Sequence, residues 1–238
     1  MPTVIVLTAV AALTYSFEIV FGLGGTILML PVLRFLLSTK ILVVYSAMPQ
    51  ILVGSIGLIR SPKTVDLRFL GWMLFYAVAG GIAGTVLFYH ISPVLFRKLL
   101  ATMVTLVGVL LVVAPGHVRI GRRAARVFDT LAGASQALFG ISGPIAMTRL
   151  LGTFEDKTVV RNYALAFFLA LNILRLTGYA AYGVLGAGTV RLMAFSAPLL
   201  IVVLWRANQL HLRVSERRFR HVVAWVIMAG GLSLFLGR

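Results

Sequence analysis

The hydrophobic pattern of this chain is broken by glycines at two places, 118 residues apart. Residues 21–26 read FGLGGT, and residues 139–144 read FGISGP. Each break interrupts an apolar stretch and frees backbone N–H groups that, inside a bilayer, only protein or a wet cavity can satisfy. A helix that restarts there directs its positive N-terminal end into that cavity. Breaks in matching positions of two halves indicate the substrate site of a secondary transporter.

The composition places the chain in a membrane. Hydrophobic residues make up 60% of it and charged residues only 12%, and the mean hydropathy is +1.01. A soluble domain carries about 25% charged residues. No basic run precedes the first apolar segment, so we expect residues 1–21 to be a retained membrane segment and not a signal peptide. The sequence therefore predicts an all-α polytopic membrane protein.

Two of the apolar segments are too short to span a bilayer, which takes about 20 residues. These are 26–37 and 144–153; each follows a glycine break and is expected to be a half-helix. The segment before the second break, 127–141, is also short, which favours a re-entrant hairpin. The remaining predicted membrane segments are 3–22, 40–59, 68–89, 94–114, 158–183, 188–205 and 219–236.

The two halves resemble each other, which indicates an internal duplication. Lys40 and Lys157 follow the half-helices at a shift of 117 residues, and SPVLFR at 92–97 matches SERRFR at 215–220. Each repeat would be one broken helix, re-entrant or discontinuous, plus three transmembrane helices. We expect an N-terminal transmembrane repeat at 1–116, a basic cytoplasmic linker at 117–126 and a C-terminal transmembrane repeat at 127–238.

Loop charges favour inverted repeats. If both broken elements crossed the membrane, the repeats would be parallel and basic residues would divide about twelve against nine, which predicts no orientation. If both re-enter, one face holds six: Arg34, Lys40, Arg97, Lys98, Arg191 and Arg238. The other holds fifteen: Arg60, Lys63, Arg68, Arg119, Arg122, Arg123, Arg126, Arg149, Lys157, Arg161, Arg206, Arg213, Arg217, Arg218 and Arg220. The second face is then cytoplasmic, and both termini lie outside the cell membrane.

The glycine motifs resemble those of a known family. GLGGTILMLPVL at 22–33 resembles the first-helix motif of the TauE/SafE family of anion exporters, and GASQALFGISGP at 133–144 is similar to that family's second-half motif. Length, duplication and the basic central loop also agree, so the resemblance covers essentially the whole chain. The family commonly has a further glycine where Thr26 and Ser142 stand here. The resemblance implies export of a small sulfur-containing anion such as sulfite, thiosulfate or a sulfonate such as sulfoacetate.

The residues at the breaks suit such an anion. Backbone N–H groups and hydroxyls at two half-helix ends can bind sulfonate oxygens without a tightly binding cation, which suits a ligand that must leave again. The alternative is that the glycines only let helices approach closely. The candidate substrate-binding residues at the breaks are Gly24, Gly25, Thr26, Ser142, Gly143 and Pro144.

Polar residues inside the other apolar segments add candidates, because polar side chains in a bilayer tend to face the protein interior. Ser46, Ser55 and Asn172 could line the same cavity, and a shift of 117 residues superposes Ser55 on Asn172. Interhelical hydrogen bonding is the alternative role. Arg175 could attract the anion, or its side chain could snorkel to the surface. Glu18 is a candidate for coupling export to protons, or it could form a structural bridge with Arg175.

Other functions are less favoured. Residues 140–143 match the GxSG sequence of rhomboid proteases, but no histidine is expected at the depth of Ser142, which a serine nucleophile needs. A passive anion channel could use the same half-helices. The absence of cysteine and of acidic or histidine clusters disfavours a metal site. We therefore expect no catalytic residues, cofactor, metal or nucleic-acid partner; the expected partners are the anion and the lipid bilayer, and a homo-oligomer is left open.

Overall fold

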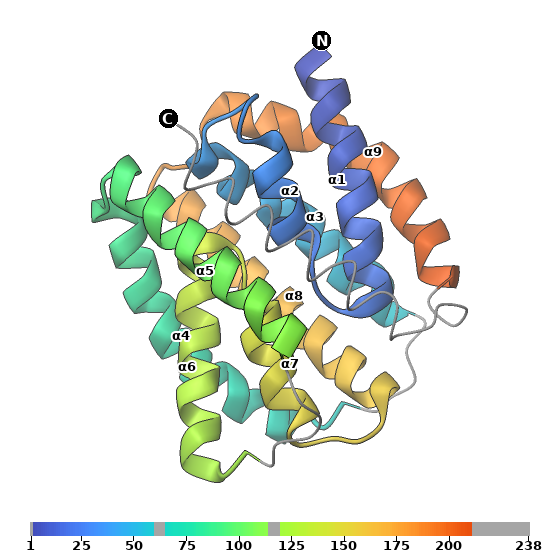
Figure 1. The fold of residues 1–238 in the computed structure, drawn as a ribbon. Helices are drawn as coiled ribbons and strands as arrows, with labels where there is room; N and C mark the ends of the chain where they lie inside the picture. The colour runs from blue at the N-terminus through green and yellow to red at the C-terminus, as the bar shows by residue number, and fades with distance from the viewer. Residues whose placement is uncertain (1, 60–64, 114–119, 211–238) are drawn as a thin grey trace.

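The computed structural model describes residues 2–59, 65–113 and 120–210, and these residues are helical with no strand among them (Figure 1). The first half contains α1 (Pro2–Phe21), α2 (Gly25–Leu33), α3 (Thr39–Ile59), α4 (Leu67–His90) and α5 (Pro93–Val113). The second half contains α6 (Arg122–Phe139), α7 (Gly143–Leu151), α8 (Lys157–Ala181) and α9 (Ala187–Leu210). The predicted segment 219–236 lies outside the described residues.

The predicted polytopic membrane protein is confirmed. Within the described residues, the helices α1, α3, α4, α8 and α9 are long and apolar enough to cross a bilayer. Large apolar side chains such as Trp72, Phe75 and Phe195 are exposed on the outside of the bundle. In water such a surface would be an aggregation hazard, whereas in a bilayer it contacts lipid.

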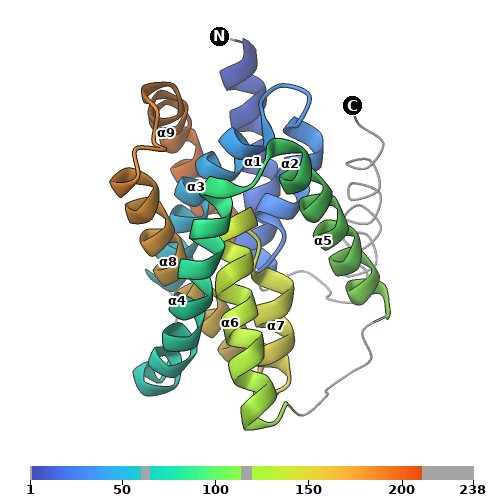
Figure 2. The ribbon, with the colours of Figure 1, turned by 90° about the vertical axis from the view of Figure 1, so that its left-hand side faces the viewer.

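Each glycine break reverses the chain. Helix α2 folds back against α1, and α7 folds back against α6, so both breaks form helical hairpins. Figures 1 and 2 show that the α1–α2 hairpin descends from the end of the bundle that carries the N-terminus, and that the α6–α7 hairpin rises from the opposite end. The turns of the two hairpins meet in the interior, where residues of both line one small cavity.

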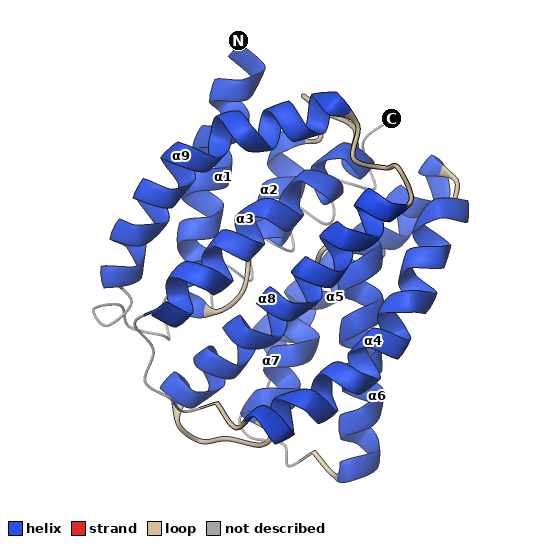
Figure 3. Ribbon diagram, turned by 180° about the vertical axis from the view of Figure 1, so that it is seen from behind, coloured by secondary structure: helices blue, strands red, loops and turns tan. Residues whose placement is uncertain are grey.

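The remaining helices pack around these hairpins in matching pairs. Helices α3 and α8 run side by side through the middle of the bundle, with α9 beside α3 and α4 beside α8 (Figure 3). Helix α1 packs against α9 and α3, and α6 packs against α4 and α8. Each hairpin is therefore enclosed by helices from both halves of the chain.

The α4–α6 contact depends on small residues. A Cβ atom on Gly80, Gly84 or Gly133 would collide with the backbone of the facing helix, at Thr130, Ala134 and Ala77 respectively. Glycine at these positions lets the two backbones approach closely, as is common between membrane helices. Close packing is thus the role of glycine at these three positions, which lie outside the two breaks.

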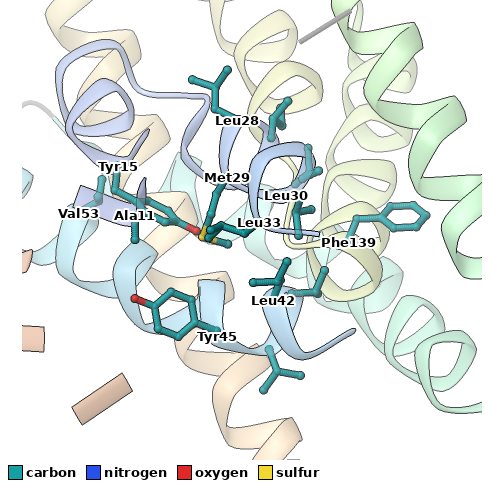
Figure 4. Packing of buried hydrophobic residues seen from close by; sticks show 14 of the residues in the cluster. Ala11, Tyr15, Leu28, Met29, Leu30, Leu33, Leu42, Tyr45, Val53 and Phe139 are labelled. Carbon is teal, nitrogen blue, oxygen red and sulfur yellow. The ribbon is translucent and has the colours of Figure 1, made fainter. Parts of the chain in front are cut away.

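A hydrophobic core surrounds the first hairpin. Tyr15, Met29, Leu33 and Tyr45 are fully or almost fully buried there, and Figure 4 shows them converging between α1, α2 and α3. A short helix with nearly all of its residues buried cannot face lipid, so α2 is held inside the bundle by this packing. The turn before α2 is thereby fixed in the protein interior.

The predicted basic linker 117–126 overlaps the start of α6. Helix α6 begins at Arg122, so residues 122–126 form its first turns. An arginine in a helix makes the helical backbone hydrogen bonds while its exposed side chain keeps its charge in water. A basic run can therefore form the first turns of a helix. Arg122, Arg123 and Arg126 are all exposed.

Candidate functional site

The backbone at both breaks needs glycine. Gly22 and Gly24 have φ values of 77° and 117°, and Gly140 has a φ value of 69°. These left-handed conformations are strained for residues with a Cβ atom. They let the chain reverse within three residues, so that α2 begins at Gly25 and α7 at Gly143.

At the first break, the chain's own carboxylate occupies the N-terminus of α2. Glu18 Oε2 accepts a hydrogen bond from the backbone N–H of Gly25 at 2.8 Å. Glu18 is 2% exposed. A carboxylate is favoured at this position because free N–H groups and the helix dipole make the N-terminus positive. One of the two donor sets expected for the substrate is therefore already bonded to Glu18.

At the second break, an amide takes the place of the carboxylate. Gln136 precedes Gly140 by four residues, as Glu18 precedes Gly22, so the two positions correspond at the same shift of 118 residues. Gln136 Oε1 accepts a hydrogen bond from Ser142 Oγ at 2.7 Å. The two breaks thus place a polar side chain at corresponding positions, but the first carries a carboxylate that bonds a backbone N–H group and the second an amide that bonds a hydroxyl.

Gln50 on α3 connects the two breaks. Its Nε2 donates to Glu18 Oε1 at 3.4 Å and to the backbone oxygen of Gly140 at 3.2 Å. Gln50 Oε1 accepts a hydrogen bond from Gln136 Nε2 at 2.9 Å. Gln136 Nε2 also donates to Asn172 Oδ1 at 2.9 Å. A continuous buried polar network therefore runs from the first hairpin to α8.

Arg175 is the cation of this network. It is 5% exposed, and its guanidinium donates to the backbone oxygen of Gln136 at 3.0 Å and to Ser46 Oγ at 2.9 Å. It does not snorkel to the surface. It also forms no direct ion pair with Glu18, because Gln50 lies between them, with its Oε1 3.5 Å from the Arg175 guanidinium.

The cavity between the two turns is small. It is lined from the first hairpin by Glu18, Leu23, Gly24, Thr26 and Ile27, from the second by Gly140, Ile141, Ser142 and Gly143, and by Gln50 and Phe168. Its volume of about 10 Å³ is near the lower limit for one water molecule. In this conformation the break site is closed around its own polar groups.

The structure brings together most of the residues that the sequence singled out. Ser46, Asn172, Arg175 and Glu18 belong to the network, and Gly24, Thr26, Ser142 and Gly143 line the break cavity. Gly25 is the first residue of α2, and Pro144 is the second residue of α7. Gly25 is buried beneath Glu18. Ser55 is half-buried and lies outside the residues that line this cavity.

Two glutamines at the centre of the network were not among the candidates. Gln136 could have been found, because the shift that aligns the two breaks also aligns it with Glu18. Gln50 has no such signal, because its counterpart at that shift is the apolar Phe168. In the sequence Gln50 stands out only as a polar residue inside an apolar segment, and its link between the two breaks follows from the meeting of the two hairpins in space.

Arg161 is a further buried cation that sequence reasoning counted as a loop charge. It lies within α8, 9% exposed, and donates through Nε and Nη2 to the backbone oxygen of Ile19 at 3.1 and 2.8 Å. Its Nη2 also bonds Asn208 Oδ1 on α9 at 2.6 Å. The last carbonyls of a helix lack intrahelical partners, so Arg161 caps α1 as Arg175 caps α6. One helix, α8, thus holds the ends of both broken helices.

Replacing Arg161 with methionine is expected to lower the free energy of unfolding by about 1.5–3 kcal/mol, because the Ile19 carbonyl and the Asn208 amide lose a charged partner. Thermal unfolding of the purified protein in detergent would measure this. Arg206→Met is the matched control, since Arg206 is exposed on the neighbouring α9, and it should change stability by less than about 0.5 kcal/mol. Equal effects of the two substitutions would contradict a capping role for Arg161.

Arg149, also counted as a loop charge, is buried too. Its Nε lies 3.7 Å from Asp129 Oδ1, and it bonds Thr153. The pair links α6 to α7 within the second hairpin. Charge counting from sequence therefore overestimated the basic residues available at that face by at least these two arginines.

The environment of Ser142 does not suit a serine nucleophile. Its hydroxyl donates to an amide oxygen, and the break cavity around it is lined by no histidine. His90, the one histidine within the described residues, is exposed at the end of α4. The described residues also contain no cluster of three or more histidine, aspartate or glutamate side chains that could hold a metal.

Comparison with known proteins agrees with this architecture. The family described as "Sulfite exporter TauE/SafE" matches residues 7–234, which is nearly the whole chain and includes both breaks. No curated protein and no solved structure gives a significant match. Two glycine-broken hairpins that meet around buried polar groups, in a chain matched over almost its full length, lead to one assignment: the chain belongs to the sulfite exporter TauE/SafE family.

Proposed function

We propose that this protein is a secondary transporter that exports a small sulfur-containing anion, either sulfite, thiosulfate or an organosulfonate such as sulfoacetate, across the cytoplasmic membrane. Family membership implies export of a sulfur anion. The meeting of two helix N-termini next to a buried arginine carries the proposal for the site. Backbone N–H groups at helix N-termini and a guanidinium are well suited to bind oxyanions.

The arrangement of the helices supports transport by two inverted repeats. If α1 corresponds to α6, α2 to α7, α3 to α8 and α4 to α9, each packing pair in one half has its counterpart in the other. The pairs α1·α9 and α4·α6 correspond in this way, as do α3·α9 and α4·α8. Movement of one repeat against the other would then open the break site alternately to the two sides.

The closed break cavity favours such a cycle over a passive channel. An anion cannot pass a space of about 10 Å³ without rearrangement of the hairpins. A channel would conduct through a continuous path while open. Saturable flux that is coupled to a second ion would distinguish the transporter from this alternative.

The distribution of charge supports an orientation. The end of the bundle at which α4, α6 and α8 begin has exposed Arg68, Arg122, Arg123 and Arg126 (Figure 1). Short basic segments stay on the cytoplasmic side of a membrane. We therefore place this end in the cytoplasm and the N-terminus outside.

Glu18 is the proposed coupling residue. An anion can reach the N–H group of Gly25 at the start of α2 only if the Glu18 carboxylate releases it. Protonation of Glu18 removes its negative charge and with it the competition for this donor. Binding of the anion would thus be linked to binding of a proton at Glu18.

The test is sulfite flux in proteoliposomes with and without a pH gradient. Glu18→Gln should leave flux measurable but independent of the gradient, because the amide cannot titrate and the second break already carries glutamine at the matching position. In the wild-type protein, coupling of one proton to each anion should change the equilibrium ratio of anion concentrations across the membrane by about tenfold for each pH unit of the gradient. Asp129→Asn, which changes a carboxylate outside the break cavity, is the control and should keep the response. Gradient-dependent flux in Glu18→Gln would remove Glu18 from the coupling step.

A further inference from the structure

A second cavity lies on the other side of Gln136 and Arg175 from the break site. It has a volume of about 230 Å³ and is lined by residues of α4, α6 and α8. An apolar cavity of about 150 Å³ in another protein holds a benzene molecule, so this space can hold a small organic ligand. Unlike the break cavity, it is large enough for an anion together with a short alkyl chain.

The inner end of this cavity is charged and incompletely bonded. Arg175 lines it and is 95% buried, since only 5% of the residue is exposed. Its Nε has no hydrogen-bond partner among the described residues, although both Nη atoms are bonded. An unpaired buried N–H group of a cation is costly. Because Arg175 Nε itself has almost no accessible surface, an anionic oxygen in the cavity would bond it only after the side chains around it shift.

The outer end is apolar and opens between α4 and α8. Ile82 and Val86 on α4, Leu174 on α8 and Tyr182 directly after α8 line the cavity and are each about half exposed or more. These side chains belong to the surface that faces lipid in a spanning bundle. The cavity therefore passes from a buried cation to an apolar mouth within one molecule.

We propose that this cavity is a binding site for an aliphatic organic anion whose charged group pairs with Arg175 and whose alkyl chain lies between α4 and α8. The inference rests on the proposed function and narrows its substrate class, because sulfite and thiosulfate have no chain to bury here. The volume of about 230 Å³ fits a short-chain free anion as the occupant. An acyl chain of a bilayer lipid is the competing occupant.

Gly178 allows the cavity to be filled without a backbone clash. It lines the cavity, and a Cβ atom added to it would meet no heavy atom within 4 Å. Gly71 on α4 is equally open, is exposed and does not line the cavity. Gly178→Leu and Gly71→Leu are therefore a matched pair of variants.

The experiment measures binding of methane-, ethane-, propane- and butanesulfonate to the protein in lipid nanodiscs by calorimetry. In wild type and Gly71→Leu the affinity should rise about fourfold for each added CH₂ group, from its transfer free energy. In Gly178→Leu this dependence should be lost. 1-Butanol, which has the chain without the charge, should bind wild type at least about tenfold more weakly than butanesulfonate.

The outcomes separate this site from the proposed function. A flat response to chain length in wild type would overturn the site, as would an undiminished response in Gly178→Leu that remains folded by thermal unfolding. A response seen in detergent and abolished in nanodiscs would assign the cavity to bilayer lipid and also overturn it. If sulfite flux is observed together with any of these results, the site is wrong but the proposed function still holds. Chain-length-dependent binding without sulfite or sulfonate flux would overturn the proposed function and support the site.

Discussion

Replacing Gly25 with alanine is expected to lower anion flux by at least about tenfold. A Cβ atom at this position would collide with the Glu18 carboxylate and would lie 2.5 Å from Tyr15 Cε1. Both side chains are buried, and Tyr15 is tied to Thr26 by a hydrogen bond of 2.9 Å. Neither can move without breaking the first turn of α2, so the added methyl must displace the hairpin. Overpacking of this kind costs about 1–3 kcal/mol.

Flux into proteoliposomes, normalised to inserted protein, would measure the effect of Gly25→Ala, and we expect a loss of at least about tenfold, which corresponds to about 1.4 kcal/mol. Gly188→Ala is the control, because a Cβ atom there meets nothing within 4 Å. Gly143→Ala should be intermediate, since its Cβ would lie 3.0 Å from Leu23 Cβ, where a small shift suffices. Wild-type flux in Gly25→Ala would mean that the first break is not part of the transport site.

Replacing Arg175 with methionine is expected to raise the KM for the anion by at least about tenfold. The substitution keeps much of the side-chain volume but removes the buried cation beside the break cavity. A hydrogen bond between a cation and an anion contributes about 1.5–3 kcal/mol. It also removes the guanidinium donor from Ser46 Oγ and from the carbonyl of Gln136, which keeps only its hydrogen bond from the backbone N–H of Gly140. Stability should therefore fall as well.

The KM and the amount of folded protein separate the two effects of Arg175→Met. Initial flux rates over a range of sulfite concentrations give the KM of the folded fraction, and thermal unfolding gives the stability. Arg175→Lys keeps the charge without the planar fork, so its KM should lie between those of wild type and Arg175→Met. If both variants were less stable but had the wild-type KM, Arg175 would be a structural cap of α6 alone.

Much of the fold follows from the sequence because glycine breaks and apolar runs are local features. The predicted half-helices 26–37 and 144–153 correspond to α2 and α7, with ends that differ by up to four residues. Their short length and the bilayer thickness together exclude spanning helices. The hairpin form of the second break also follows, since α6 has too few apolar residues to cross alone.

The composition of the site could be predicted only in part. Glycines, Ser142, Asn172 and Arg175 stand out because small or polar residues are unusual in apolar segments. Burial of Arg149 and Arg161 could not be predicted, because arginine near a segment end is usually exposed and only a tertiary partner reveals otherwise. For Arg161 that partner is the carbonyl of Ile19, 142 residues away in the chain.

The sequence by itself thus determined that the chain is helical, spans a membrane and breaks twice at matching glycines, because these properties depend on hydropathy and on backbone freedom at single residues. The tertiary structure decided which polar groups meet. It placed Glu18 on the N-terminus of α2, inserted Gln50 between Glu18 and Arg175, and left one Arg175 N–H group beside an apolar cavity. The contact between Gln50 and Arg175 joins residues 125 positions apart, and only the packing of α3 against α8 brings these two side chains within hydrogen-bonding distance.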